Sequence, residues 1–413
     1  MNSAGLRVNA ARLRADIEAL SQIGLYENQG IFRMAFSAHD IEARDWFRGR
    51  IEDSGLEFFR DGAANLFARL NWNDRIPSVM SGSHLDTVPG AGHLDGALGV
   101  LCALEALRTL QESGIPLQRP LEAVAFTDEE GRFGGLFGSE AVAGLVTPDY
   151  LRDANDLEGT NLVAAMSECG LDANDALTAK RAPRSIHAYV EMHIEQGPVL
   201  DRKGLSIGIV EAITGLFKWE IALSGTVNHA GTTPMDMRED AFQGLVEFAA
   251  RIDPILSQKG RAQSTATIGR VELKPGAANV IPGLAVFSLD VRDTDSDTLI
   301  ALAETFRSTL SAIAAERGLG LEVKVLSEIA PVHCDAMVVE AIERAVTASG
   351  SSAIRMRSGA AHDAQIIAGI APTGMIFVPS QNGRSHSIVE ATDWEDIETG
   401  ANILLNTLKQ LAS

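Results

Sequence analysis

The sequence predicts an α/β protein, with a mixed sheet flanked by helices and a smaller α+β unit inserted into it. Short apolar segments alternate with longer segments in which apolar residues recur three and four positions apart, as is typical of buried strands and amphipathic helices. Between 211 and 327 the order of these patterns becomes βαββαβ. The chain has 413 residues, which is long enough for two domains and a large core.

Each predicted element rests on its apolar pattern. Helices are expected where apolar residues share one face, as Leu13, Ile17 and Leu20 do. The predicted helices are 9–22, 39–53, the segment between Asp95 and Gly114, 238–252, 296–317, 336–349 and 394–411. The predicted strands are 56–59, 65–70, 121–126, 188–193, 218–223, 265–272, 285–291, 320–325 and 373–379. Short helices and loops are expected over 135–180.

The inserted unit sets the expected domain boundaries. We assign 1–210 together with 328–413 to one domain and 211–327 to a second. The order βαββαβ describes a compact unit with helices on one face of a sheet. Its exposed sheet edge or helix face would be a natural surface for a homodimer.

Composition restricts the partners and the compartment. Lys and Arg total 35 and Asp and Glu total 55, and the resulting net charge of −20 argues against binding to nucleic acid or to an anionic membrane. The three cysteines form no CxxC pair, which indicates reduced thiols and a cytoplasmic protein. The N-terminus lacks the apolar run of a signal peptide, and no run of about 18 apolar residues could cross a membrane.

The most informative stretch is GSHLDTVPGAGHLDG at 82–96. We expect a strand that ends near Met80, then a Gly-rich loop, with Asp95 at the N-cap of the next helix. Imidazole and carboxylate ligands together suit Zn, Mn, Co or Ni, so His84 and Asp95 are candidate ligands. Asp86 could orient the His84 imidazole without binding the ion itself. The alternative is a capped helix after a polar loop, which is the better interpretation of His-x-Asp alone.

Further polar residues follow other predicted strands. Glu129 and Glu130 follow the strand 121–126, and on an extended backbone they would point to opposite sides, so that one could bind a metal while the other faces a water molecule. His193 ends the next strand beside Gln196, and another histidine lies in the loop after 373–379. A solvated acidic turn and a core or surface histidine are the alternatives.

Three loops of the inserted unit also hold polar residues. His229 follows its first strand, Asn279 lies between two strands, and Arg292 ends the strand 285–291. These three side chains would suit an anion or an oxyanion. Turn chemistry and a surface ion pair of Arg292 with Asp293 are the alternatives.

Seven motifs carry a resemblance to a known family: GSHLDTVP, DGALGV, DEEGRF, HIEQGPVL, NHAGTTPM, GAANVIPG and RSHS. In this order they resemble the M20-type metallopeptidase superfamily, and more narrowly its hydantoinase/carbamoylase branch. That branch contains N-carbamoyl-L-amino-acid hydrolases, allantoate amidohydrolases and β-ureidopropionases. The match covers nearly the whole chain and implies a metallopeptidase-like catalytic domain, with 211–327 as a dimerisation domain.

The resemblance implies a site for two divalent ions, which would be Zn, Mn, Co or Ni. Asp95 would bridge the two ions, and Glu129 would be the general base that takes a proton from the attacking water. Asp86 would orient His84 with its carboxylate. The implied metal ligands are His84, Asp95, Glu130, His193 and His386.

The resemblance also implies the residues that contact the substrate. Gln196, Asn279 and Arg292 would hold the carboxylate and ureido groups, and His229 would stabilise the transition state across a homodimer. The chain departs from the family pattern at four places, which bear on the choice of substrate. These are His93-Leu94, the short loop 130–133, Ala361 in place of a glycine, and Ile388 in place of a proline.

The expected activity is hydrolysis of the carbamoyl C–N bond of an N-carbamoyl-L-amino acid to the amino acid, carbon dioxide and ammonia. Allantoate and N-carbamoyl-β-alanine are alternative small ureido-acid substrates, and an N-acyl amino acid is a more distant one. A non-catalytic binding dimer would require the loss of a metal ligand or of Glu129, and all of these residues are present.

Overall fold

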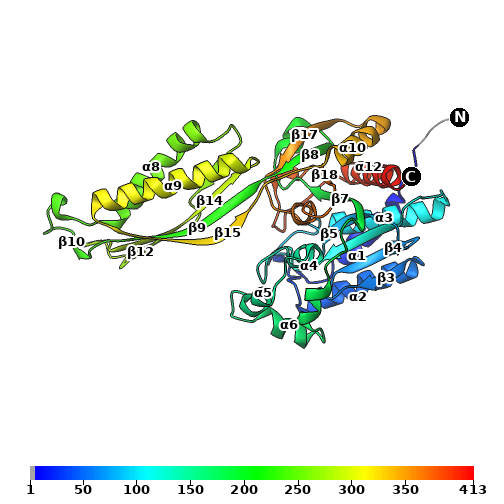
Figure 1. Ribbon diagram of the computed structural model, residues 1–413, viewed down its shortest axis with the longest axis horizontal. Helices are drawn as coiled ribbons and strands as arrows, with labels where there is room; N and C mark the ends of the chain where they lie inside the picture. The colour runs from blue at the N-terminus through cyan, green and yellow to red at the C-terminus, as the bar shows by residue number, and fades with distance from the viewer. Residues whose placement is uncertain (1–4) are drawn as a thin grey trace. The chain divides into compact units, whose positions relative to one another are not determined.

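The computed structural model describes residues 5–413 and divides into two compact units (Figure 1). Among the described residues, unit 1 is formed by 5–211 and 334–413, and unit 2 by 212–333. Among residues 5–413, no helix is both long and apolar enough to cross a membrane.

Unit 1 contains most of a nine-stranded mixed sheet, of which only one short edge strand and the last two residues of the strand beside it fall within 212–333. Its strand order is β16-β8-β18-β7-β5-β6-β4-β3, with β17 paired to β8. The strands are β3 (Glu57–Arg60), β4 (Leu66–Leu70), β5 (Ser78–His84), β6 (Leu121–Phe126), β7 (Ile186–Ile194), β8 (Ile207–Ile213), β16 (Val332–His333), β17 (Ala353–Ser358) and β18 (Thr373–Val378). The central strands β18, β7, β5 and β6 are parallel, and antiparallel strands flank them. β6 and β18 are buried at every position, as expected of parallel strands covered on both faces.

Helices flank this sheet. They are α1 (Ala10–Leu20), α2 (Ala38–Asp53), α3 (Ala97–Ser113), α4 (Phe137–Ala143), α5 (Pro148–Asp153), α6 (Leu162–Glu168), α7 (Val199–Lys203), α10 (Ala336–Ser349), α11 (Asp363–Ile367) and α12 (Trp394–Ala412). The main hydrophobic core joins the central strands to α1, α2, α3, α10 and α12. α3 is the most enclosed helix, since it is buried at every position from Ala97 to Leu110. A second apolar cluster lies among α4, α5 and α6.

Three short helical turns and a small hairpin lie in the connections between the larger elements of the chain. The hairpin is β1 (Leu25–Tyr26) with β2 (Gly30–Ile31), and the turns are η1 (Ala173–Thr178), η2 (Met235–Met237) and η3 (Gln381–Gly383).

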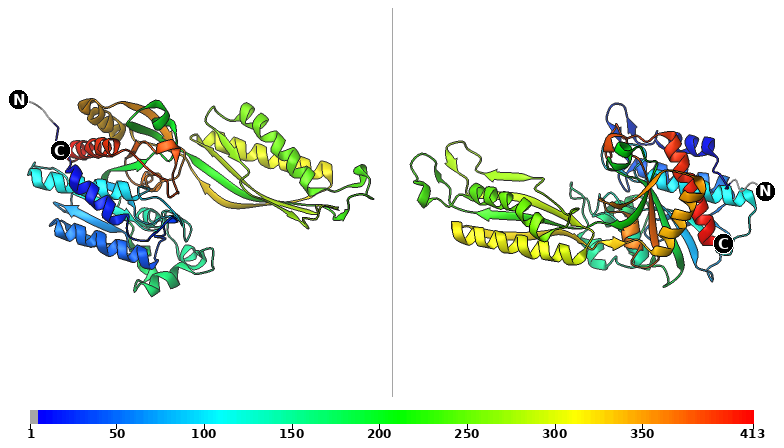
Figure 2. Two further views of the ribbon diagram at one scale, coloured as in Figure 1. Left: turned by 180° about the vertical axis from the view of Figure 1, so that it is seen from behind. Right: turned by 90° about the horizontal axis from the view of Figure 1, so that it is seen from above.

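Unit 2 is a five-stranded antiparallel sheet with two long helices, α8 (Ala241–Lys259) and α9 (Ser296–Arg317). The sheet runs β11-β14-β9-β15 with β12 paired to β14, and the helices lie side by side along one face (Figure 2). Its strands are β9 (Gly215–Ser224), β11 (Thr265–Thr267), β12 (Val271–Lys274), β14 (Leu284–Asp293) and β15 (Gly320–Ile329). A separate pair, β10 (Asn228–His229) with β13 (Val280–Ile281), joins two of its loops.

The structure confirms the predicted fold class, a mixed sheet flanked by helices, and corrects three local predictions. β5 continues through the segment Ser81–Ser83, predicted as loop, because pairing with β6 and β7 keeps this polar segment extended. Gly96, with a φ of +62°, takes the N-cap position of α3 instead of Asp95, and no side chain caps that helix. The predicted strand 265–272 is two strands, β11 and β12, which both pair with β14.

Candidate metal centre

Four segments at one edge of the unit 1 sheet supply the site. The parallel strands β18, β7, β5 and β6 are neighbours, so their carboxyl ends meet at the same edge, where open α/β sheets bind their ligands. His84 ends β5, and His193 is the next-to-last residue of β7. Glu130 follows β6, and His386 lies in the loop after β18. The strand order therefore gathers residues that are far apart in the sequence.

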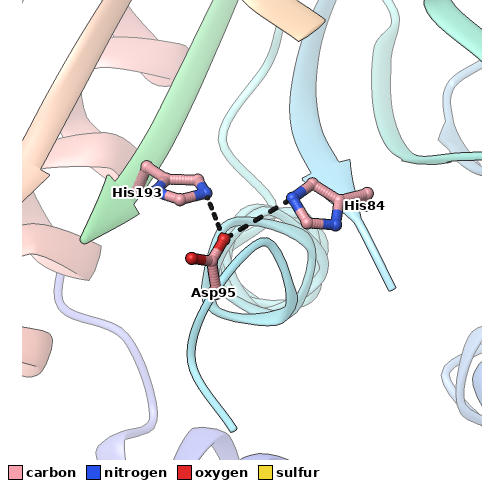
Figure 3. A group of neighbouring side chains, drawn as sticks. All are labelled: His84, Asp95 and His193. Atoms are coloured by element: carbon pink, nitrogen blue, oxygen red, sulfur yellow. Dashed lines mark ion pairs between the residues drawn. The ribbon is translucent and has the colours of Figure 1, made fainter. Parts of the chain in front are cut away.

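The carboxylate of Asp95 lies at the centre of this group. Its Oδ1 is 3.1 Å from Nε2 of His193 and 3.7 Å from Nε2 of His84, and its Oδ2 is 3.4 Å from Nε2 of His386. Figure 3 shows the carboxylate between the rings of His84 and His193. Gly96 makes this approach possible, because a Cβ at that position would lie 2.3 Å from the His84 ring.

The two buried imidazoles both present Nε2 to Asp95. Nδ1 of His84 lies 2.9 Å from the carbonyl oxygen of Asp86, and Nδ1 of His193 lies 2.9 Å from the carbonyl oxygen of Ile194. A carbonyl only accepts hydrogen bonds, so Nδ1 is the protonated nitrogen and, in a neutral ring, Nε2 keeps its lone pair. This is the tautomer that a metal-binding histidine needs, with its other nitrogen held by the protein.

Asp86 plays a different part from the expected one. Its carbonyl oxygen, not its carboxylate, orients His84. Its buried carboxylate accepts the backbone N–H groups of Glu129, at 3.4 Å, and Glu130, at 3.1 Å. Asp128, with a φ of +54°, begins this turn. Asp86 therefore connects the loop after β5 to the acidic turn after β6.

The acidic turn brings two carboxylates to the histidines. Oε2 of Glu129 lies 3.4 Å from Nε2 of His84, and Oε2 of Glu130 lies 3.4 Å from Nε2 of His386. The ligand atoms of His84, Glu129 and Glu130 all lie within 4.8 Å of one another, as do those of Asp95, Glu130 and His386. Asp95 and the acidic turn thus connect the buried histidines with His386.

Gln196 and Ser385 also contact Asp95. Nε2 of Gln196 donates to Asp95 Oδ2 at 2.7 Å and lies 3.5 Å from Nε2 of His386. The hydroxyl of Ser385 donates to the same Oδ2. Gln196 adopts a left-handed backbone conformation, with a φ of +57°, which turns its side chain toward the metal-ligand cluster.

Burial and mutual contact shift the pKa values of these groups. Burial and the neighbouring Glu130 hold the pKa of Glu129 well above its ordinary value. Burial, reinforced by Asp95, raises the pKa of Glu130 to about 8. Burial alone would lower the pKa of His193, but the Asp95 carboxylate raises it to about 9, and a hydrogen bond to Asp95 raises the pKa of His386 to about 9. Protons and a metal ion would therefore compete for the same atoms.

The cluster fits divalent metal ions. Two donors that each lie about 2.1 Å from one ion in tetrahedral geometry are about 3.4 Å apart, and the separations of 3.1–3.7 Å in this group match that value. The donors are imidazole nitrogens and carboxylate oxygens, the ligand types that zinc and its neighbours take. Oε1 of Glu130 is buried and has no hydrogen-bond partner among residues 5–413.

In unit 2, His229 and Asn279 are neighbours. β10 pairs with β13, which sets His229 opposite Val280, and the N–H of Ala230 donates to the carbonyl oxygen of Asn279 at 2.9 Å. Both residues are exposed. Figure 1 shows β10 at one end of the unit 2 sheet.

Arg292 lies at the other end of that sheet. β14 starts beside β13 with Leu284 and is paired with β9 along its whole length, with Arg292 opposite Leu216. A strand rises about 3.3 Å per residue, so Arg292 lies about 26 Å from Leu284. The guanidinium makes two hydrogen bonds, at 2.8 and 3.2 Å, to Asp290. Asp293, its partner in the alternative of a surface ion pair, is buried and accepts from Ser264.

Sequence reasoning missed three polar residues around the cluster. The first is His362, whose buried ring packs edge-to-face on His193 with 4.7 Å between centroids. Ala361, which was predicted to contact the substrate, immediately precedes it. Glu191 is fully buried in β7 and accepts hydrogen bonds from Ser83 and Tyr189. An acidic residue between the apolar residues Val190 and Met192 of a strand is a signal that could have identified Glu191. Glu390 contacts the Asp95 loop across 295 residues of sequence, and no local pattern predicts that contact.

The α/β fold and this nitrogen and oxygen cluster are those expected of a hydrolase that uses divalent metal ions. Residues 80–410 match peptidase family M20/M25/M40, and the chain belongs to that family. It is 39% identical over 411 residues to the N-carbamoyl-L-amino acid amidohydrolase of Geobacillus stearothermophilus, covering 98% of this chain and 99% of that protein. It is 38% identical over 405 residues to the allantoate amidohydrolase of Escherichia coli K12, covering 95% and 96%.

A solved structure has the same fold. The crystal structure of an amidase of the hydantoinase/carbamoylase family from Burkholderia multivorans superposes with a TM-score of 0.89 at 34% identity, covering 98% of each chain. The resemblance drawn from the seven motifs is therefore confirmed over nearly the full length of the chain.

Proposed function

We propose that this protein hydrolyses the carbamoyl C–N bond of an N-carbamoyl-L-amino acid, with water, to the free amino acid, carbon dioxide and ammonia. The observation that carries the proposal is the convergence of His84, Asp95, Glu130, His193 and His386 at one sheet edge, with Glu129 among them. Full-length similarity to an N-carbamoyl-L-amino acid amidohydrolase supports this substrate class.

The ligand set would hold two divalent ions, of the Zn, Mn, Co or Ni type. His84 and His193 would bind one ion, Glu130 and His386 the other, and Asp95 would contribute one carboxylate oxygen to each. What supports this division is that Oδ1 faces the two buried histidines and Oδ2 faces His386. Bound ions would polarise the ureido carbonyl and lower the pKa of a nearby water.

Glu129 would move the proton. Its carboxylate would accept the proton of the attacking water and deliver it to the amino-acid nitrogen as the C–N bond breaks. What supports this assignment is its position 3.4 Å from the Nε2 of His84, while the adjacent carboxylate of Glu130 faces His386. Glu129 lies beside the proposed ligands but would not itself bind an ion, so its carboxylate would stay available to the attacking water.

Gln196, Asn279 and Arg292 would bind the substrate, with Ala361 on the wall of the site. Gln196 would direct its amide to the ureido group, and Arg292 would present its planar fork to the substrate carboxylate. Arg292 already makes a two-bond contact of this kind with Asp290.

His229 and its neighbour Asn279 would act in the site of a second chain, which requires a homodimer. What supports this is the separation of about 26 Å along β14 between Arg292 and the end of the sheet that bears His229 and Asn279. That span is longer than a small ureido acid, so both ends of unit 2 cannot contact one substrate from a single chain.

An open sheet edge would suit the dimer contact. Among the described residues, β15 pairs only with β9, so its other edge is open. The side chains of Val325 and Leu326 on this strand are exposed. A ten-residue edge strand with exposed apolar side chains is a ready template for pairing with another copy.

The test is turnover of a substrate panel by protein reconstituted with each metal. N-carbamoyl-L-amino acids should be hydrolysed faster than their D-enantiomers, allantoate, N-carbamoyl-β-alanine and N-acetyl amino acids. Faster turnover of allantoate would reassign the substrate within the same chemistry. No turnover of any ureido acid by metal-loaded dimer would overturn the proposal.

A further inference from the structure

A buried carboxylate outside the ligand set joins two of the ligand loops. Glu390 is 3% exposed, and its Oε1 accepts the backbone N–H groups of Leu94, at 2.8 Å, and Asp95, at 3.1 Å. Its Oε2 lies 3.2 Å from the hydroxyl of Ser385, and that hydroxyl also contacts Asp95 Oδ2. Glu390 therefore connects the loop that holds Asp95 to the loop that holds His386.

The His386 loop depends on such contacts more than the other ligands do. The side chains of His84 and His193 are 2% and 1% exposed and belong to central strands, so packing fixes them. The side chain of His386 is 46% exposed, and its backbone has a φ of +52°. Its position is set by the loop and not by a surrounding core.

The Glu390 side chain fits beside Gly92 because that residue has no side chain of its own. A Cβ added to Gly92 would lie 2.4 Å from both Cβ and Oε1 of Glu390, far closer than real contacts allow. Gly92 has no left-handed φ, so what a side chain would meet there is Glu390 and not backbone strain. The Gly92 position provides evidence independent of the hydrogen bonds.

We propose that Glu390 is a positioning residue that holds Asp95 and His386 in register, and that it governs retention of the ion on the Glu130–His386 side. This inference rests on the proposed two-ion site. Glu390 would act through the backbone of Asp95 and through Ser385, without touching an ion or the substrate. Residues that orient metal ligands in this way affect metal affinity by about 10–100-fold when they are changed.

The test compares two substitutions of Glu390. Glu390→Ala removes the acceptor of both backbone N–H groups. Glu390→Gln keeps one side-chain oxygen that can accept them and replaces the oxygen beside Ser385 with an NH2 group, which can donate to the Ser385 hydroxyl oxygen. Metal-stripped protein would be titrated with Mn²⁺ by calorimetry. Electron paramagnetic resonance would then distinguish a coupled ion pair from single ions.

We expect Glu390→Ala to bind one ion with near wild-type affinity and the second at least about tenfold more weakly. Glu390→Gln should recover most of the loss, because it keeps the geometry. Gly92→Ala, which leaves the carboxylate in the sequence but displaces it, should also weaken the second ion. It serves as the second variant if Glu390→Ala folds poorly.

Glu122→Ala is the matched control. Glu122 is fully buried in β6, toward the amino end of that strand, and accepts from Arg69, Arg181 and Ser78. Its loss should lower the melting temperature without a selective loss of one ion. Equal loss of the second ion in this control would mean that any buried carboxylate has the effect, and would overturn the inference.

The remaining outcomes separate the two proposals. Wild-type protein that binds no ion would overturn the proposed function itself. Wild-type protein that binds two ions and hydrolyses a ureido acid, with Glu390→Ala binding both ions at unchanged affinity, would overturn only the role of Glu390.

Discussion

Asp86 holds Glu130 through the backbone. Oδ2 of Asp86 accepts the Glu130 N–H at 3.1 Å, while the carbonyl oxygen of Asp86 lies 2.9 Å from Nδ1 of His84. One residue thus orients a proposed ligand by its main chain and another by its side chain. The carboxylate is fully enclosed, and the two N–H groups it accepts belong to the acidic turn.

Asp86→Ala should therefore damage the acidic turn more than the His84 ring. The carbonyl contact with His84 survives any side-chain change, whereas the N–H groups of Glu129 and Glu130 lose their acceptor. We expect kcat to fall by about 10–100-fold, with weaker binding of metal. Kinetics and metal titration of the variant would check this. A variant that alters only the His84 resonances in NMR spectra, with normal turnover, would contradict it.

Glu129→Gln should keep the metal and lose turnover. The amide is nearly the same shape as the carboxylate but cannot accept a proton at neutral pH, and the loss of a general base lowers rates by about 10²–10⁴-fold. Metal content and kcat would be measured on the same preparation. Near wild-type kcat would remove Glu129 from the role of base.

Mixing two inactive variants should restore part of the activity. A Glu129→Gln chain lacks the base of its own site, and a His229→Ala chain lacks the histidine that would act in the site of its partner. A dimer of one chain of each kind would therefore contain one site with both groups intact. Separately tagged chains would be unfolded together, refolded and purified as heterodimers. Absence of activity in proven heterodimers would show that His229 does not act across the dimer.

Arg292→Lys should weaken kcat/KM toward a carboxylate substrate. The bidentate fork is replaced by a single ammonium, a loss of about 1.5–3 kcal/mol for a charge-assisted hydrogen bond. Arg270→Lys is the matched control, because Arg270 immediately precedes β12 of the same sheet and pairs with Glu220. Comparison of an N-carbamoyl amino acid with its carboxamide gives the second readout. An unaffected Arg292→Lys enzyme, or equal turnover of the two compounds, would rule out carboxylate recognition.

Metal binding should tighten as the pH rises from 6 to about 9 and should release protons. The pKa values of His193 and His386 are raised to about 9 and that of Glu130 to about 8, so at pH 7 the metal-free groups hold protons that an ion must displace. Above those values no proton competes, and affinity should level off. Calorimetry in buffers of different ionisation enthalpy would count the protons. Affinity that stays constant from pH 6 to pH 9 would contradict this expectation.

The sequence predicts most elements because their signals are local. Helix α9 follows from apolar spacing alone, and strand β6 from a short apolar run between turns, and both match the structure end to end. β5 was predicted too short because Ser81 and Ser83 are polar, and only pairing with neighbouring strands keeps them extended. The N-cap of α3 was misplaced because Gly96 is left-handed, a feature that no apolar pattern encodes.

The candidate site divides in the same way. Histidines and carboxylates at strand ends can be identified from the sequence, because parallel strands bring their carboxyl ends to one edge. The contact of Glu390 with the Asp95 loop depends on how the last loop folds back over the sheet. The separation of Arg292 from His229 depends on the length and direction of β14, although Asn279 and Arg292 are close in sequence.

The length of β14 has a consequence for how activity depends on the amount of protein. If each site takes Arg292 from one chain and His229 from another, an isolated chain owns no complete site. Specific activity would then decline on dilution, along the same curve as dissociation of the pair. A chain that lacks only His229 would disable the site of its neighbour and keep its own, whereas a chain that lacks only Glu129 would disable its own site and leave that of its neighbour intact.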